Sequence, residues 1–304
     1  MSGTLNAKED VEILADKDPG VGLPGRVYLP GYSRTMGPQS HLFAERERLQ
    51  SLTWEHFDVK QLSPTIGAEL VGLDLSQELP DEVVSEIQQA LWDYKVIFFR
   101  NQEITSEQQI RFAQRFGELE IHPFLPPNTE TPELVRFEKN ANAAGYENQW
   151  HHDVTWRETP SQGAILRAIE IPPIGGDTLF VDANAAYEGL TQEMKDEIDS
   201  LNAVHDFLRA FGRQVPKEKL AEMREMYPLV KHPVVINHHQ TGKPLLYVNR
   251  IFVNGIEGYD EKEGFELIDA LCREFEVLEY SCRFKWEKNS IAFWDNQAVQ
   301  HYAT

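Results

Sequence analysis

Residues 150–156 read WHHDVTW and place two adjacent histidines and an aspartate between apolar and β-favouring residues. In a β-strand, residues i and i+2 project from the same face, so His151 and Asp153 would point to one side and His152 to the other. The stretch therefore predicts two neighbouring metal ligands, an imidazole and a carboxylate. The alternative is a polar loop that binds no metal, because short His-x-Asp triplets also occur by chance.

A third ligand has to come from a distant part of the chain. Two histidines and one carboxylate form the facial triad with which non-haem Fe(II) oxygenases hold their metal. His301 is the best candidate, since it follows a strand-like run and an Asp-Asn turn that leads the chain back. Other histidines have simpler interpretations: His232 precedes a proline and is expected to be structural, while His238 and His239 lie in a polar turn and are expected to be solvated.

The chain around these residues alternates short strands with turns that contain proline and glycine. Strand-like runs are expected at 57–62, 68–75, 96–100, 163–171, 177–183, 232–239, 244–249 and 290–296, and helices at 41–52, 79–95, 104–119, 185–201 and 265–276. In the second of these helices one face is apolar, with Val83, Val84, Ile87, Ala90, Leu91 and Tyr94. The pattern predicts an α+β chain with a jelly-roll or sandwich core and flanking helices.

Composition limits the classes of partner and the compartment. The net charge of −20 over 304 residues argues against nucleic acid and against an anionic membrane surface. The two cysteines, Cys272 and Cys282, are too few for a disulfide framework and are expected to be buried or free thiols. No apolar run approaches the roughly 20 residues that span a bilayer, and the first residues do not resemble a signal peptide, so a cytoplasmic enzyme is expected.

Three motifs follow one another along the chain: WHHDVTW at 150–156, GGDTLF at 175–180 and WDNQAVQHYA at 294–303. Together with FGELEIHP at 116–123 and HPVV at 232–235, they resemble the taurine dioxygenase family, which includes the 2,4-dichlorophenoxyacetate dioxygenases. The resemblance runs from about residue 57 to the end. It indicates a domain at 56–304, preceded by an N-terminal extension or arm at 1–55 that is rich in glycine and proline and packs on it.

The resemblance implies a double-stranded β-helix of the cupin-like jelly-roll type, with Fe(II) as metal and 2-oxoglutarate and O2 as co-substrates. It implies that His151, Asp153 and His301 hold the iron and that the Thr178 hydroxyl binds the 2-oxoglutarate carboxylate. Without the resemblance, Thr178 reads as an ordinary strand threonine. Three protein ligands on one octahedral face leave two positions for 2-oxoglutarate and one for oxygen.

The implied reaction oxidises a C–H bond of a small anionic or zwitterionic molecule and releases succinate and CO2. Relatives of this kind often form dimers or tetramers, so a homo-oligomer is expected. In the family, an arginine about eleven residues after the distal histidine clamps the far carboxylate of 2-oxoglutarate. The sequence stops at Thr304, so the natural chain is expected to continue beyond it; Arg250 and Arg283 are not matched substitutes.

The residues that would line the substrate pocket are carried over only in part. His122 matches a histidine that contacts the taurine sulfonate, and Phe211 and Val154 match apolar lining positions. Leu125 replaces a tyrosine that binds the sulfonate, and Glu147 stands where an asparagine is expected. We therefore expect a substrate other than taurine, such as an amine-bearing acid that pairs with Glu147. The simpler reading is a solvated loop carboxylate at 147 and a packed histidine at 122.

Two other functions are open at this point. Zinc prefers three protein ligands and a water, so the same His/Asp/His set could serve a zinc-dependent hydrolase or isomerase. A non-catalytic binding module on a decayed oxygenase scaffold is the third interpretation, and only the missing arginine supports it. Consumption of 2-oxoglutarate with formation of succinate separates the first hypothesis from both.

Overall fold

Strand β5 (Val96–Phe99) lies at the centre of the largest sheet and is buried on both faces. In the computed structural model, residues 27–28, 35–36, 39–125, 130–139, 147–213 and 215–304 are described. The sheet has the order β3 (Asp58–Gln61), β4 (Ala68–Val71), β5, β14 (Ile291–Asp295), β6 (Gly163–Arg167). Only β4 and β5 pair in parallel, because helix α3 (Asp81–Tyr94) carries the chain back between them.

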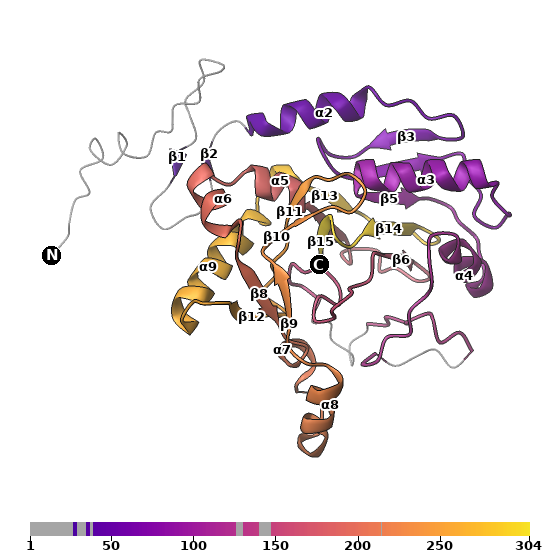
Figure 1. Cartoon of the computed structure of the whole chain (residues 1–304). Helices are drawn as coiled ribbons and strands as arrows, with labels where there is room; N and C mark the ends of the chain where they lie inside the picture. Colours follow the sequence, from indigo (N-terminus) through magenta and orange to yellow (C-terminus); the bar gives the residue numbers. More distant parts are fainter. Residues whose placement is uncertain (1–26, 29–34, 37–38, 126–129, 140–146, 214) are drawn as a thin grey trace.

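The outer face of this sheet is covered by helices. The six positions predicted to form the apolar face of α3 are all buried, and all of them except Val84 belong to the core cluster that contains Ile97, Phe99 and Phe293 of the sheet. Helix α4 (Ser106–Gln114) follows the cap residue Thr105, whose side chain forms a capping box with Gln108. Figure 1 shows α3 and α4 beside β5 and β14.

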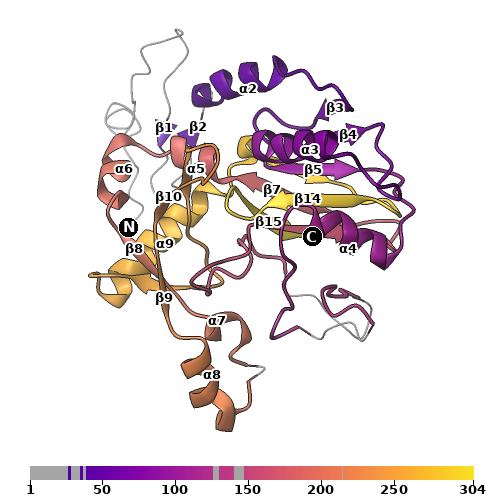
Figure 2. The same ribbon diagram turned by 45° about the vertical axis from the view of Figure 1, so that its right-hand side comes forward.

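The inner face of the sheet packs on a second, three-stranded antiparallel sheet. Its order is β13 (Ser281–Phe284), β7 (Thr178–Asp182), β15 (Val299–Ala303). Phe98 of β5 stacks on Phe284 at 3.9 Å between ring centroids and meets Phe180 edge-on at 5.6 Å. Figure 2 shows β7, β14 and β15 close together near the end of the chain. This packing fixes β15, and therefore His301, against the core.

The remaining elements surround the two facing sheets. A third sheet has the order β12 (Val253–Ile256), β8 (Asn202–His205), β9 (Val230–Pro233), and two hairpins pair β10 (Val235–Asn237) with β11 (Pro244–Leu246) and β1 (Val27–Tyr28) with β2 (Thr35–Met36). The other helices and turns are η1 (Ser40–Leu42), α2 (Phe43–Gln50), α5 (Ala183–Glu188), α6 (Gln192–Ile198), α7 (Leu208–Phe211), η2 (Lys217–Lys219), α8 (Leu220–Met226), α9 (Glu261–Glu274) and η3 (Leu278–Tyr280). The predicted mixture of helices with a strand-rich core is confirmed.

The helix expected at 41–52 is present as η1 and α2, and it is tied to the core by charge. Glu45 lies 2.7 Å from the Lys243 ammonium, and Arg48 lies 2.7 Å from Asp93 of α3. Most of the predicted arm, residues 1–26, 29–34 and 37–38, lies outside the described residues.

The predictions on cysteine are confirmed, because Cys272 and Cys282 are both free and buried. Burial raises the pKa of each thiol to about 12, so both are protonated and unreactive at neutral pH. Among the helices that the structure describes, none combines the length and apolar character that crossing a membrane requires.

Candidate active site

His151 and His301 face each other across an isolated antiparallel bridge. The His151 N–H donates to the His301 carbonyl at 3.2 Å, and the His301 N–H donates to the His151 carbonyl at 3.0 Å. Residues directly opposite in such a pair carry their side chains on the same face. The two imidazole rings accordingly lie 4.2 Å apart between centroids.

Asp153 reaches the same place from a turn and not from a strand. Residues 153–156 form a turn directly after the bridge, and Val154 has a φ of 50°. The strand geometry that would place His151 and Asp153 on one face is therefore absent here, although the two side chains still converge. The Asp153 carboxylate lies 3.6 Å from His151 Nε2 and 3.8 Å from His301 Nε2.

These three side chains are suited to a metal ion. One ligand atom of each lies within 4.8 Å of the other two. A metal at about 2.1 Å from each donor needs neighbouring donors about 3 to 3.5 Å apart, so small inward shifts suffice. The structure thus brings together the three residues predicted as ligands, from two segments about 150 positions apart in the sequence.

The protonation of the histidines also fits metal binding. His151 Nδ1 lies 2.8 Å from the Gln149 carbonyl oxygen, to which an Nδ1–H can donate, so Nε2 keeps its lone pair for a metal. Burial, together with the neighbouring His151, lowers the pKa of His301 to about 4, against the opposing effect of Asp153. His301 is therefore neutral at neutral pH, which is the form that a metal binds.

Thr178 is the first residue of β7 and is buried. In the antiparallel pairing of β7 with β15, Thr178 opposes Ala303 and Phe180 opposes His301. Alternate residues of a strand share a face, so Thr178 and His301 lie on the same face of this sheet. The Trp286 indole N–H donates to Thr178 Oγ1 at 2.9 Å, which leaves the hydroxyl hydrogen free to donate to a ligand.

His122, Val154 and Phe211 lie together in an apolar cluster that adjoins the turn at 153–156. Val154 belongs to a cluster of buried aromatic residues, against which Phe211 packs. The His122 ring lies 5.7 Å from the Phe211 ring. The structure thus brings three of the five predicted substrate residues to one wall beside Asp153.

Hydrogen bonds set the tautomer of His122. Its Nδ1 accepts the backbone N–H groups of Phe124 at 3.2 Å and Leu125 at 3.1 Å. Burial lowers the pKa of His122, so the neutral ring carries its proton on Nε2 and offers an N–H donor. Leu125 contributes to this site through its backbone.

The Glu147 carboxylate is engaged elsewhere. Its Oε1 lies 2.7 Å from the Lys139 ammonium, and its backbone carbonyl accepts the N–H of Ala303. Arg283 pairs with Asp177 at 2.7 Å and its side chain is 60% exposed, while Arg250 pairs with Asp269 and Glu276. Neither arginine therefore takes the place of a 2-oxoglutarate clamp.

The profile described as "Taurine catabolism dioxygenase TauD, TfdA family" matches residues 58–304. The chain belongs to this family. Among curated relatives of this TauD, TfdA family member, an alkylsulfatase from Acinetobacter baylyi is 33% identical over 257 residues, covering 82% of this chain and 80% of the relative. An α-ketoglutarate-dependent sulfate ester dioxygenase from Pseudomonas putida is 35% identical over 255 residues, covering 81% and 83%.

Solved structures agree with the family assignment. A taurine dioxygenase from Burkholderia xenovorans superposes with a TM-score of 0.71 and 36% identity, covering 82% of this chain and 83% of that one. The predicted family and enzyme class are confirmed: this member of the TauD, TfdA family is a 2-oxoglutarate-dependent dioxygenase that uses Fe(II) and O2. The family therefore favours iron over the zinc alternative and catalysis over a binding module.

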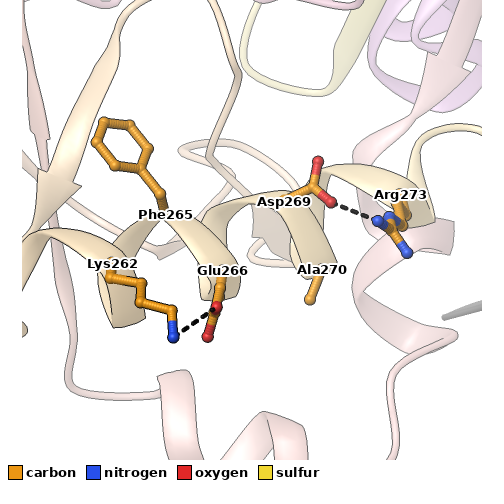
Figure 3. Close-up of a pocket in the computed structure, with 6 residues that line it drawn as sticks. All are labelled: Lys262, Phe265, Glu266, Asp269, Ala270 and Arg273. Carbon is orange, nitrogen blue, oxygen red and sulfur yellow. Dashed lines mark ion pairs between the residues drawn. The ribbon is translucent and has the colours of Figure 1, made fainter. Parts of the chain in front are cut away.

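A depression on α9 has no part in this chemistry. It is lined by Lys262, Phe265, Glu266, Asp269, Ala270 and Arg273 (Figure 3). Its charged groups pair with one another, Lys262 with Glu266 at 3.7 Å and Arg273 with Asp269 at 2.7 Å. None of these residues belongs to the triad or to the cluster around His122.

Sequence reasoning missed two residues that contact the site residues. Trp286 donates to Thr178, and Asn296 binds the backbone of Asp153. The Asp-Asn turn before His301 is the available signal for Asn296, but the sequence indicates only that the chain reverses there. His238, predicted to be solvated, is instead buried with its Nε2 2.8 Å from Asp295.

Proposed function

We propose that the chain oxidises the carbon next to the ester oxygen of an alkyl sulfate, with Fe(II) held by His151, Asp153 and His301. The observation that carries the substrate assignment is the neutral His122 ring, an N–H donor set in an apolar aromatic wall beside Asp153. A donor for the anion next to an apolar wall for the chain suits an amphiphilic anion. Two relatives named for sulfate esters support the same choice.

The residues divide the work of binding. The His122 Nε2–H donates to a sulfate oxygen, and Val154 and Phe211 contact the alkyl chain and exclude water. The Thr178 hydroxyl, positioned by Trp286, donates to a 2-oxoglutarate carboxylate oxygen. The Glu147 carboxylate is paired with the Lys139 ammonium and is therefore not assigned to the amine of a zwitterionic substrate. We propose a substrate with an apolar tail instead.

The bound Fe(II), 2-oxoglutarate and O2 supply the oxidation that converts the substrate C–H bond to C–OH, with release of succinate and CO2. A carbon that carries both a hydroxyl group and a sulfate ester then loses hydrogen sulfate and becomes an aldehyde. The C–O bond to sulfate breaks and the hydroxyl proton leaves, so the products are an aldehyde and inorganic sulfate.

A substrate comparison tests this proposal. The full chain with Fe(II), 2-oxoglutarate and O2 is given hexyl sulfate, hexanesulfonate, hexanoate, 2,4-dichlorophenoxyacetate or taurine, and succinate, sulfate and aldehyde are measured. Hexyl sulfate should give the highest kcat/KM and equal amounts of sulfate, aldehyde and succinate. Taurine as the best substrate, or succinate without sulfate, would refute it.

His122→Phe should raise the KM for hexyl sulfate about 10- to 100-fold, because a hydrogen bond to a charged group contributes about 1.5–3 kcal/mol. The KM for 2-oxoglutarate should not change, since the His122 ring lies among Phe124, Trp156 and Phe211, away from the β7 residue Thr178 that is assigned to 2-oxoglutarate. His122→Gln, which keeps an N–H donor, should lose less affinity. Steady-state kinetics with each substrate varied in turn give both constants, and an unchanged KM in His122→Phe contradicts the assignment.

We infer further that the five-stranded and three-stranded sheets are the two walls of a double-stranded β-helix. Their packing through Phe98, Phe180 and Phe284 supports this inference. The boundary between an arm at 1–55 and a domain at 56–304, a homo-oligomeric state and a cytoplasmic location stay predictions. Sedimentation velocity of the purified chain tests the oligomeric state.

A further inference from the structure

The side chain of Asn296 forms hydrogen bonds with both backbone polar groups of Asp153. Asn296 Oδ1 accepts the Asp153 N–H at 2.7 Å, and Nδ2 donates to the Asp153 carbonyl at 2.9 Å. A second hydrogen on Nδ2 donates to the Ser161 carbonyl at 3.0 Å. Asn296 is 1% exposed, so the amide uses both donors and an acceptor away from water.

The turn that Asn296 holds is one that the local sequence does not favour. Val154, directly after Asp153, has a φ of 50°, in the left-handed region that β-branched residues avoid. Such a conformation persists only where surrounding contacts impose it. The two bonds from Asn296 fix the peptide groups on either side of the Asp153 Cα, and so they fix the direction of the Cα–Cβ bond that carries its carboxylate.

Asn296 is itself held in a well-bonded turn. Its N–H donates to the Gln162 carbonyl at 2.8 Å. The preceding Asp295 accepts the N–H groups of Gln297 at 2.9 Å and Ala298 at 3.2 Å. Its other oxygen lies 2.8 Å from His238 Nε2, and both side chains are buried.

The same turn joins β14 to β15, the strand that carries His301. The turn therefore positions two triad residues at once, Asp153 through the Asn296 amide and His301 through the chain itself. A rigid connection of this kind sets the distance between a carboxylate and an imidazole before any metal arrives.

We propose that Asn296 is a positioning residue that holds the Asp153 carboxylate in its metal-binding direction in the metal-free protein. The proposal rests on the assignment of Asp153 as a metal ligand. It predicts that loss of the Asn296 amide weakens metal binding beyond what a general loss of stability causes. Partners that orient metal ligands typically contribute 10- to 100-fold in metal affinity.

Gln102 provides a matched control with the same set of hydrogen bonds. It is buried, its Oε1 accepts the Leu75 N–H at 2.8 Å, and its Nε2 donates to the carbonyls of Leu73 and Arg100 at 2.9 Å each. These partners lie in the loops before α3 and after β5 and include no triad residue. Removing the Gln102 amide therefore tests the effect of losing three buried hydrogen bonds alone.

The experiment compares Asn296→Ala and Gln102→Ala by titration with Mn(II), which replaces Fe(II) without oxidation, and by urea unfolding of the metal-free chains. Both variants should lose stability, and only Asn296→Ala should bind Mn(II) about 10- to 100-fold more weakly. Equal Mn(II) affinity in Asn296→Ala and the wild type overturns the proposal. So does an equally large loss of affinity in Gln102→Ala.

A measurement on the wild-type chain keeps the test independent of variant folding. In the metal-free protein, the Asp153 amide should exchange its hydrogen as slowly as the amides of β15, and rapid exchange that slows only with Mn(II) would overturn the proposal. An Asp153→Ala variant that binds Mn(II) as tightly as the wild type would overturn the metal assignment itself and the proposal with it. If Asp153→Ala weakens Mn(II) binding but Asn296→Ala does not, the role of Asn296 is overturned and the metal assignment stands.

Discussion

Asp153→Ala will abolish 2-oxoglutarate turnover and leave the folding of the metal-free protein nearly unchanged. The loss of turnover should exceed about a hundredfold, because even indirect partners of metal ligands contribute up to that much. The effect on folding should be within about 1 kcal/mol, as for other substitutions away from packed features. The Asp153 side chain is 34% exposed, and no hydrogen bond joins its carboxylate to another described residue.

The two hydrogen bonds from Asn296 go to the Asp153 backbone and survive the substitution. Succinate formation measures turnover, and urea unfolding of the metal-free chain measures stability. Asp269→Ala is the control, since Asp269 is a half-exposed carboxylate on α9 that pairs with Arg250 and Arg273. Turnover in Asp153→Ala at the level of Asp269→Ala would show that the triad does not hold the catalytic metal.

Elements that depend on local pattern were predictable from the sequence. In α3 every position on the predicted apolar face is buried, because the 3.6-residue period places those side chains on one side of the helix whatever packs there. In α4 the sequence leaves Thr105 and Ser106 both open as the cap, and the structure has Thr105, whose capping box with Gln108 is formed within four residues. The strand-like run expected at 96–100 is likewise present as β5, at Val96–Phe99.

One helical segment was predicted where the structure has two. The stretch at 185–201 divides at Gly189, where a side chain would collide with the Tyr280 hydroxyl, 2.2 Å from the position of its Cβ. Helix α5 ends there, and Thr191 caps α6. Tyr280 lies 91 positions further along the chain, so the periodicity of the segment alone could not show that position 189 has no room for a side chain.

At the site, the identity of the metal ligands was predictable from the sequence, whereas their geometry was not. His151, Asp153 and His301 could be chosen from motif and resemblance, but the turn at Asp153 depends on Asn296, 143 positions away. His238 was misassigned for the same reason, because its partner Asp295 is 57 positions away and turns a polar loop position into a buried pair. Contacts between distant segments decide which polar residues are buried, and a single sequence does not display them.

Acidification will destabilise the metal-free protein through His205, and replacing this residue will make stability less dependent on pH. His205 is fully buried, with Nδ1 2.9 Å from the Thr155 hydroxyl. Burial, with a smaller effect of the neighbouring His232, lowers the pKa of His205 to about 3. In the unfolded chain a histidine takes up a proton below about pH 6.5.

Between about pH 6.5 and pH 3 the unfolded state therefore binds one more proton at this residue than the folded state does. The free energy of unfolding falls as the pH falls, by about 1.4 kcal/mol per pH unit from His205 once the pH is well below 6.5. Above pH 6.5 both states are neutral at this position, and the contribution disappears. Urea unfolding of the metal-free protein at several pH values measures the slope.

His205→Gln should remove this part of the slope, so its stability should fall less steeply than that of the wild type between pH 6 and pH 4. Thr155→Val is the control, because it deletes the hydroxyl that bonds to His205 and retains the histidine. It should lower stability by a similar amount at every pH and keep the wild-type slope. Parallel pH profiles of stability for His205→Gln and the wild type would contradict this prediction. They would mean that His205 takes up its proton in the folded protein as readily as in the unfolded chain, and therefore that its buried site opens to water on acidification.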